Sequence, residues 1–230
     1  MAKIPIVHTT VATGTDAGTG EIHKAQWNEG HVTPDSVPIS PSAFDDEFAS
    51  TSTFSSTLGS PTANNTSDVS GYLHLSKSGT GSFQLHGCYK TAPSTPFTVT
   101  TKIPHAVFNA NYNQYGPMVL DSTPTAIYLT GPTFQSSSGI PELVYGKWNS
   151  RTSRGTISEY TGYLPNMLYH RLVCHSSSNV DVYMSPDNQL WVPVITGANP
   201  GFTIANVGLF VTGNDNSTNP DSFFEWVRFT

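Results

Sequence analysis

The sequence predicts an all-β protein, an antiparallel β-sandwich with an extended N-terminal arm. Three observations support this fold class. Residues 97–103 alternate, with Phe97, Val99 and Ile103 on one face, as in a half-buried strand. About ten or more short apolar runs follow one another at spacings of roughly 10–15 residues, which favours a sandwich or jelly roll. No long amphipathic helical pattern interrupts them, which excludes a doubly wound α/β fold.

The other candidate strands are short apolar runs bounded by turn-forming residues. Val180, Val182 and Met184 alternate with Asp181 and Tyr183, so we expect the first three to face a core. The complete set, besides residues 97–103, is 71–77, 82–87, 117–121, 126–130, 143–148, 168–175, 180–184, 190–195, 206–212 and 222–229.

The composition excludes several classes of protein. Charged residues make up 11% of the chain, against roughly 25% in ordinary domains. The net charge is −6 and no Lys/Arg cluster occurs, so nucleic-acid binding is not expected. No apolar run approaches the roughly 20 residues of a membrane helix, and residues 1–11 lack the apolar core of a signal peptide. We therefore expect synthesis in the cytoplasm, after which the protein either stays there or leaves by another route, such as lysis.

Two cysteines, Cys88 and Cys174, lie far apart in the sequence and fit no metal-binding spacing. They are expected to be free thiols packed as small hydrophobic side chains. The alternative is a disulfide between facing strands.

Residues 1–40 differ from the rest of the chain and are interpreted as an attachment arm and linker, followed by the sandwich over residues 41–230. Residues 14–20 are rich in Gly and Thr and form turns. Residues 21–31 can form one or two helical turns that Gly30 ends. Three prolines over residues 34–41 favour extended backbone. The arm has too few apolar side chains to fold alone. We therefore expect it to become ordered only by contact with the sandwich or with a partner protein.

Four groups of motifs, in order, carry a resemblance to a known fold family. They are residues 44–48 with 71–75, residues 97–103 with 112–121, residues 172–191, and residues 207–210 with 223–229. In this order they resemble the concanavalin A-like lectin/glucanase jelly roll over residues ~43–230. The resemblance implies that the segment after Pro41 lies beside residues 223–229. It also places Asn188 at a hairpin position that requires left-handed backbone.

The arm carries a second resemblance. In residues 18–31, the pair Trp27-Asn28 is followed by His31, and this is similar to a segment near the start of phage tail-fibre and other virion proteins. The resemblance implies that the arm binds other phage virion proteins. Its candidate contact residues are Ile22, His23, Trp27, Asn28 and His31. Trp27 either anchors the arm in a pocket of a partner or folds back onto its own sandwich.

The pattern of acidic residues does not predict a glycoside hydrolase. Hydrolases of this fold carry E-x-D-x-x-E on one strand, and nothing here matches it. Asp121, Glu142 and Glu159 are isolated in the sequence. No Gly-x-Ser-x-Gly elbow follows an apolar strand. The protein is therefore predicted not to be an enzyme and to need no cofactor.

No metal site is predicted. Asp45, Asp46 and Glu47 are adjacent and are expected to face solvent or cap a turn. Asp45, Asp46 or Asp221 could join backbone carbonyls around a calcium ion at the rim of the sandwich. No Asp-rich ligand loop supports this alternative.

The candidate ligand-binding residues are aromatic side chains in polar loop sequence. Sugar binding needs an aromatic face and short polar groups. Tyr112, Tyr160 and Tyr163 meet this description, and Trp148 is included with them. The alternative for Trp148, as for Tyr115 and Trp191, is that it covers the edge of the core.

Taken together, these observations predict a non-enzymatic bacteriophage virion protein, either a tail fibre or receptor-binding tip or a capsid decoration or head fibre. Its sandwich would bind host-surface glycans, and a homo-oligomer is expected because linked weak sites gain avidity. Its location would be the virion. Two alternatives remain: a free carbohydrate-binding, lectin-like module, and a glycoside hydrolase with an unrecognised site.

Overall fold

The computed structural model describes residues 42–49, 52–77, 83–106, 113–135, 140–160, 167–213 and 220–230. Within these ranges the chain forms sixteen strands and no helix. The described part of the chain accordingly holds no helix that could cross a membrane. Every strand pair is antiparallel, which confirms the predicted fold class. The arm lies outside the described residues, so its boundary with the sandwich stays a prediction.

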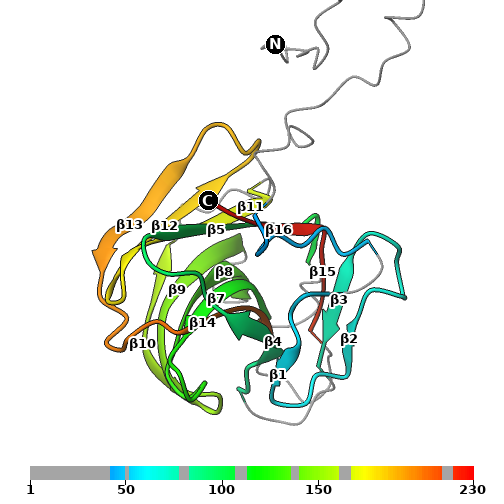
Figure 1. Ribbon diagram of the computed structural model, residues 1–230, viewed down its shortest axis with the longest axis horizontal. Helices are drawn as coiled ribbons and strands as arrows, with labels where there is room; N and C mark the ends of the chain where they lie inside the picture. The colour runs from blue at the N-terminus through cyan, green and yellow to red at the C-terminus, as the bar shows by residue number, and fades with distance from the viewer. Residues whose placement is uncertain are drawn as a thin grey trace, which may run out of the picture. The chain divides into compact units, whose positions relative to one another are not determined.

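Three sheets make up the sandwich (Figure 1). The first has seven strands in the order β1 (Ser56–Leu58), β4 (His86–Thr91), β14 (Asn206–Thr212), β7 (Gln114–Leu120), β8 (Ile127–Gln135), β9 (Ile140–Ser150) and β10 (Ser153–Tyr160). The second has five, β13 (Val192–Ala198), β12 (Asn179–Ser185), β11 (Tyr169–Ser176), β5 (Phe97–Lys102) and β16 (Trp226–Phe229). The third has four, β2 (Ala63–Asn65), β3 (Leu73–Ser76), β15 (Asp221–Phe224) and β6 (His105–Ala106).

The main core lies between the five-stranded and seven-stranded sheets. Val99, Leu172 and Val182 come from the five-stranded sheet, and they share one cluster with Val119 and Leu209 of the seven-stranded sheet. All five are fully buried. Burial of each such side chain stabilises the fold by about 1.5–3 kcal/mol. The alternation that predicted the strands is therefore the pattern that builds this core.

The seven-stranded sheet also buries its other face. Met118, Leu120, Phe210 and Trp148 alternate with the core residues, so they point away from the five-stranded sheet. They are all fully buried and form a second apolar cluster. Because both faces are apolar, the strands of this sheet show weaker alternation than residues 97–103.

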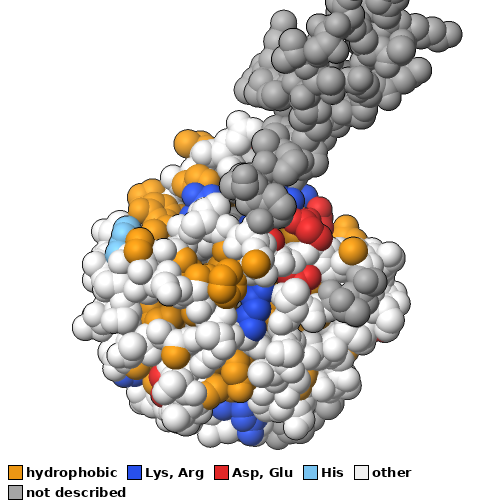
Figure 2. All heavy atoms as spheres, viewed as in Figure 1, with side chains coloured by type: hydrophobic (Ala, Val, Ile, Leu, Met, Phe, Trp, Pro, Cys, Tyr) orange, Lys and Arg blue, Asp and Glu red, His pale blue; other side chains and the backbone are white. Residues whose placement is uncertain are grey.

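The uncharged composition is visible on the molecular surface. Figure 2 shows that on one face of the described sandwich most side chains are uncharged, with hydrophobic groups between them and only scattered Lys, Arg, Asp and Glu. In an antiparallel sheet with one solvated face, polar side chains point to the solvent and apolar side chains point to the core.

The two ends of the described chain lie side by side, as the resemblance implied. Asp46 and Val227 exchange two backbone hydrogen bonds of 2.9 and 2.8 Å. The Asp45 carboxylate accepts a third bond, from the backbone N–H of Phe229, at 2.7 Å. Residues 44–48 make this bridge rather than a strand paired with β3.

Two strand predictions need correction. The run 222–229 was predicted as one strand, but it divides at Glu225 into β15, in the four-stranded sheet, and β16, in the five-stranded sheet. The run 82–87 was predicted as a strand, but the strand there, β4, begins only at His86. Strand β10 was not predicted, because its sequence is polar and rich in Ser and Thr.

The hairpin and cysteine predictions are confirmed. Asn188 has a φ of 60°, the left-handed conformation expected of it, in the turn between β12 and β13. The Asp187 carboxylate fixes that turn by accepting backbone hydrogen bonds from Gln189 and Leu190 at 2.9 and 2.8 Å. Cys88 and Cys174 are free, buried thiols, and burial raises the pKa of both.

Candidate functional site

The four-stranded sheet presents aromatic and charged side chains on its outer face. Leu73, Leu75 and Phe224 are buried on its inner face. Their neighbours along the strands, His74 and Phe223, therefore face outward. Backbone pairing places His74 directly opposite Phe223, which fixes the two rings next to each other.

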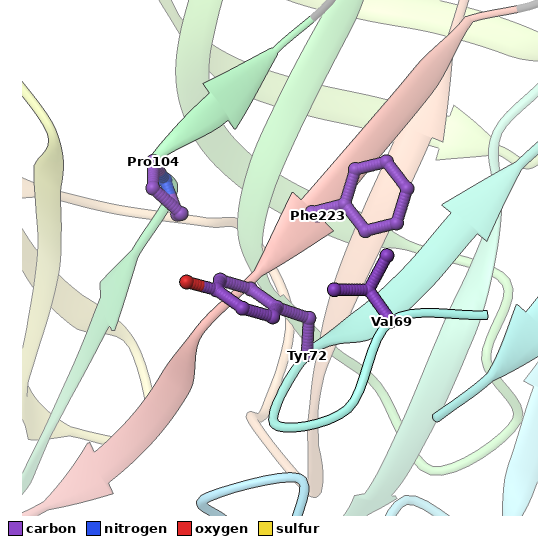
Figure 3. Close-up of a pocket in the computed structure, with 4 residues that line it drawn as sticks. All are labelled: Val69, Tyr72, Pro104 and Phe223. Atoms are coloured by element: carbon purple, nitrogen blue, oxygen red, sulfur yellow. The ribbon is translucent and has the colours of Figure 1, made fainter. Parts of the chain in front are cut away.

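An apolar pocket of about 320 Å³ lies on this side of the molecule (Figure 3). Val69 and Tyr72 come from the loop between β2 and β3, Pro104 follows β5, and Phe223 belongs to β15. Figure 3 shows the four side chains that line it, with the Tyr72 ring extending toward Pro104 and the Phe223 ring on the side of Val69. The volume is at the lower end of the roughly 300–1,000 Å³ of small-molecule sites, so it suits a small group or one ring.

The loop that carries Val69 and Tyr72 is held by its own sequence. The side-chain oxygen of Asn65 accepts hydrogen bonds from the backbone N–H groups of Ser67 and Asp68, at 3.0 and 3.1 Å. Gly71 has a φ of 82°, a conformation that side chains rarely adopt. The backbone N–H of Tyr72 then donates to the Val69 carbonyl at 3.2 Å. Both pocket side chains are thus positioned by a closed turn rather than by a free loop.

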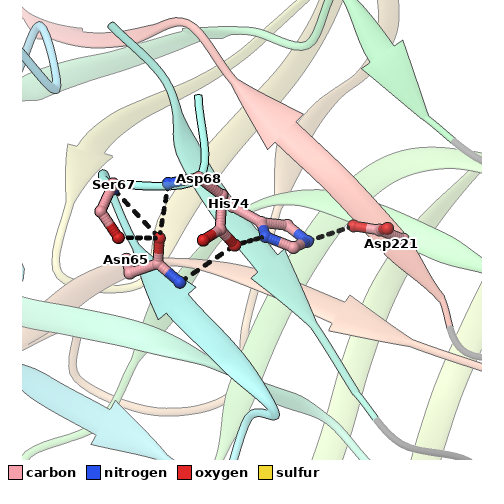
Figure 4. A network of polar contacts seen from close by, with 5 residues as sticks. All are labelled: Asn65, Ser67, Asp68, His74 and Asp221. Atoms are coloured by element: carbon pink, nitrogen blue, oxygen red, sulfur yellow. Dashed lines mark hydrogen bonds and ion pairs between the residues drawn. The ribbon is translucent and has the colours of Figure 1, made fainter. Parts of the chain in front are cut away.

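A charged group adjoins the pocket. Nε2 of His74 lies 2.6 Å from a carboxylate oxygen of Asp221, and Nδ1 contacts the carboxylate of Asp68. Figure 4 shows the ring between the two acids. Each carboxylate is thus held by one nitrogen of the same imidazole ring. The hydrogen bond from His74 holds the pKa of Asp68 below its usual value, and Asn65 adds to this effect.

Phe223 joins the pocket to the charged group. Its ring stacks on His74 with the centroids 4.5 Å apart and the planes 14° from parallel. The same ring lines the pocket. Stacked aromatic rings at this separation make a favourable contact. Phe223 thus connects the pocket with His74 and its two acidic partners, Asp68 and Asp221, whose side chains are 45% and 36% exposed.

This arrangement combines apolar surface with hydrogen-bonding groups. His74 holds the two carboxylates in place, and their remaining lone pairs can accept hydrogen bonds. Apolar walls with acceptors at the rim are the elements from which sites for hydroxylated ligands are built.

The structure describes the side chain of one predicted ligand-binding aromatic residue, Trp148, and places it in the protein interior. Trp148 has 0% exposure, in the apolar cluster on the outer face of the seven-stranded sheet. Phe83 packs against its ring edge-on at 6.3 Å. The prediction that Trp148 binds a ligand at the surface is therefore wrong, and the alternative of a packing role is confirmed.

The remaining predicted site residues are not tested. Tyr112 and Tyr163 lie outside the described residues, and Tyr160 ends β10 with a side chain that is not described. The arm residues Ile22, His23, Trp27, Asn28 and His31 also lie outside the described residues.

The pocket residues were not predicted from the sequence. Tyr72 stands in a polar, Gly-containing stretch and could have been found by the aromatic-plus-polar criterion that selected Tyr160. The contact between His74 and Asp221 joins residues 147 positions apart, and only the pairing of β3 with β15 brings them together.

Two acids that are isolated in the sequence are neighbours in the sheet. Glu159 on β10 pairs directly with Val144 on β9, and Glu142 is two residues before Val144. Both acids therefore face the same side of the sheet as diagonal neighbours, a pair of positions that is typically about 7–8 Å apart, and somewhat less between Cβ atoms. Glu142 is 2% exposed, whereas Glu159 is exposed. The pairing of β9 with β10 thus brings together two acids that are isolated in the sequence.

No metal cluster accompanies the acids. The described residues contain no group of three His, Cys, Asp or Glu side chains that could hold a metal ion. Asp46, considered for calcium, is 5% exposed, and its carboxylate accepts backbone hydrogen bonds from Phe48 and Thr53 at 2.9 and 2.6 Å. Asp46 therefore caps a turn, which is one of the two roles expected for it. Asp221 is engaged by His74 instead.

Comparison with known proteins places the fold. No protein-family model and no curated protein sequence matches the chain. Among solved structures, a functionally unknown protein from Saccharomyces cerevisiae matches with a TM-score of 0.59 and 15% identity, over 80% of this chain and 98% of that one. The GH43 protein BlXynB from Bacillus licheniformis gives 0.55 and 15%, over 86% of this chain but only 41% of that protein.

A third solved structure that resembles this chain is a lectin-like domain. The legume lectin-like domain from Entamoeba histolytica matches with a TM-score of 0.51 and 9% identity, over 76% of this chain and 88% of that domain. At such identities the likeness shows the fold alone. The fold is the concanavalin A-like jelly roll, which lectin-like domains and parts of glycoside hydrolases share.

Proposed function

We propose that the sandwich binds carbohydrate without hydrolysing it, at the pocket beside the four-stranded sheet. The observation that carries this proposal is the pocket itself, in which two aromatic rings, Tyr72 and Phe223, stand beside two exposed carboxylates. Aromatic faces pack on the apolar side of a sugar ring, and carboxylates accept hydrogen bonds from its hydroxyl groups. The small volume favours a terminal sugar or a short branch over a long chain running through a groove.

The biological setting is a further part of the proposal. The resemblance of residues 18–31 to the start of phage virion proteins supports a tail fibre, receptor-binding tip or capsid decoration protein. The arm would attach to other virion proteins, and the sandwich would bind glycans of the host surface. A homo-oligomer would raise the avidity of a small, weak site.

The binding proposal is tested with a glycan array. Wild type should give signals that Tyr72→Ala reduces about five- to tenfold, since loss of one stacked aromatic removes about 1–1.5 kcal/mol. The matched control is Leu190→Ala, which removes an apolar side chain that is 66% exposed in the β12–β13 turn. Equal signals from wild type and Tyr72→Ala, or no signal from wild type, would contradict the proposal.

Attachment through the arm is tested separately. Deletion of residues 1–40 should leave a folded sandwich with unchanged glycan binding, because the pocket and core residues of the described part of the chain build the sandwich on their own. The truncated protein should fail to enter virus particles when it is expressed in trans during infection. Normal incorporation would rule out the arm as the anchor.

A glycoside hydrolase is the second candidate, and the positions of Glu142 and Glu159 favour it. Inverting glycosidases use two carboxyl groups about 6.5–9.5 Å apart, which diagonal neighbours on a sheet can provide. One acid is buried and the other exposed, as the two roles require different environments. Hydrolysis of a glycan by wild type that Glu142→Gln and Glu159→Gln each abolish would establish this function, and its absence would leave binding alone.

A further inference from the structure

A row of polar side chains crosses the outer face of the five-stranded sheet. Val99, Leu172 and Val182 are buried on its inner face, so the residues next to them in each strand face outward. Backbone pairing places these neighbours in one line across four strands. The line is Tyr183, Arg171, Thr100 and Arg228, on β12, β11, β5 and β16.

Arg171 is held in one orientation at the centre of this row. Its Nε donates a hydrogen bond of 3.0 Å to the hydroxyl oxygen of Thr100. Its guanidinium carbon lies 3.5 Å from the centre of the Trp191 ring, so the cation stacks on the indole face. Trp191 and Arg171 are both partly exposed. A stacked guanidinium keeps its outer N–H groups available in a rigid fork, and little side-chain entropy is lost when they bind a ligand.

The other charged groups on this face are already paired. Arg228 bonds Glu47 at 3.0 Å, and Lys102 bonds Glu225 at 3.1 Å. One oxygen of Asp181 accepts hydrogen bonds from His175 and from the Tyr183 hydroxyl, at 2.8 and 3.2 Å. The other oxygen of Asp181 accepts the backbone N–H of Gly197 at 2.7 Å.

Arg171 is consequently the cation on this face that has no acidic partner within the described chain. It stacks on Trp191, and Tyr183 is its neighbour across the sheet. Burial lowers the pKa of Arg171, yet arginine remains charged at any physiological pH. The positive charge is thus partly desolvated, which strengthens its attraction for an anion.

We propose that Arg171, with Trp191 and Tyr183, forms a second binding site, for the carboxylate of an acidic sugar. The guanidinium fork matches a planar carboxylate through two parallel hydrogen bonds. The two aromatic side chains supply flat apolar surfaces for the ring that carries the acid. This site is independent of the pocket, because it uses a different sheet and none of the pocket residues.

Calorimetric titration of the full chain with trigalacturonate tests the proposal, with the neutral methyl ester of the same oligosaccharide as the matched ligand. Wild type should bind the acid and not the ester, with an affinity that falls as salt is added. Arg171→Gln should weaken binding at least tenfold. The matched control is Arg228→Gln, in which a cation of the same row that is already paired is removed, and it should change binding less than twofold.

Two further measurements test the binding site without a substitution and test whether its ligand is a carboxylate. The NMR signal of the Arg171 Nε–H should shift when wild type is titrated with trigalacturonate, and it reports on the site without any substitution. A sulfated trisaccharide serves as a second probe, and a stronger shift with it would contradict the assignment of a carboxylate ligand. No shift with either probe, or equal affinities for wild type and Arg171→Gln, would overturn the proposal. Tyr72→Ala should leave trigalacturonate binding unchanged, so failure of this site and failure of the pocket are distinguishable.

Discussion

The outer faces of the four-stranded and seven-stranded sheets differ in what they leave accessible. The seven-stranded sheet buries Trp148, Met118 and Phe210 on its outer face, with 0% exposure for each. The four-stranded sheet leaves Phe223 partly exposed and adds Tyr72 from a loop. In one sandwich, therefore, a large aromatic side chain stabilises the fold in one place and is available to a ligand in another. Sequence composition around the two positions does not distinguish these roles.

The largest expected effect tests the stabilising side of this comparison. Trp148→Ala should lower the free energy of unfolding by about 3–5 kcal/mol, because it leaves a large cavity in a packed cluster. Urea denaturation measures the change. A loss below about 1 kcal/mol, together with lost glycan binding, would show that Trp148 is a ligand-binding residue after all.

A pH dependence separates the core from the pocket. His170 is fully buried, and burial lowers its pKa from 6.5 to about 4. The folded state therefore keeps His170 neutral while the unfolded state takes up a proton, and stability falls as the pH drops from 6.5 to 4. The loss should reach about 3 kcal/mol below pH 4. Urea denaturation between pH 7 and pH 4 should show this slope in wild type and a smaller one in His170→Leu, and equal slopes would contradict the assignment.

The pocket should respond to acid in a lower range. The pKa of Asp68 is below its usual 3.8, so its bond to His74 contributes above that value and is lost as the pH falls through the lowered pKa. Glycan binding should therefore persist at pH 5, where the core has already lost part of its stability. Binding measured at pH 7, 5 and 3.5 checks this order, and loss of binding before any loss of stability would contradict it.

The smallest expected effect lies at the pocket. Tyr72→Ala should change the free energy of unfolding by less than about 1 kcal/mol, because the side chain is partly exposed and outside both apolar clusters. Its effect on glycan binding should be about five- to tenfold. Urea denaturation and calorimetric titration on the same sample separate the two. A destabilisation similar to that of Trp148→Ala would indicate a structural role for Tyr72.

Local patterns predicted the parts of the fold in which one side of a strand is buried. Residues 206–212 form a strand with the predicted bounds, and Asn188 adopts the left-handed conformation expected from its place in the turn. Alternation failed where apolar residues occupy both faces. Phe224 and Trp226 are both buried on either side of Glu225, so the pattern gave no sign that the chain changes sheets there.

The site was less predictable, for the same physical reason. On β9 both Leu143 and Val144 are buried, so alternation could not show that Trp148 points into an apolar cluster. The pair His74 and Asp221 and the pair Glu142 and Glu159 depend on strand order, which the sequence does not encode locally. Residue type indicated which side chains can bind sugar, and topology decided which of them meet.

The measurement that tests the central claim most directly is NMR mapping of a glycan that gives a signal on the array. Titration into isotope-labelled protein should shift the resonances of Val69, Tyr72 and Phe223, which line the pocket beside the four-stranded sheet. Shifts confined to Trp148, Ile157 and Glu159, on the outer face of the seven-stranded sheet, would place the ligand there and contradict the account.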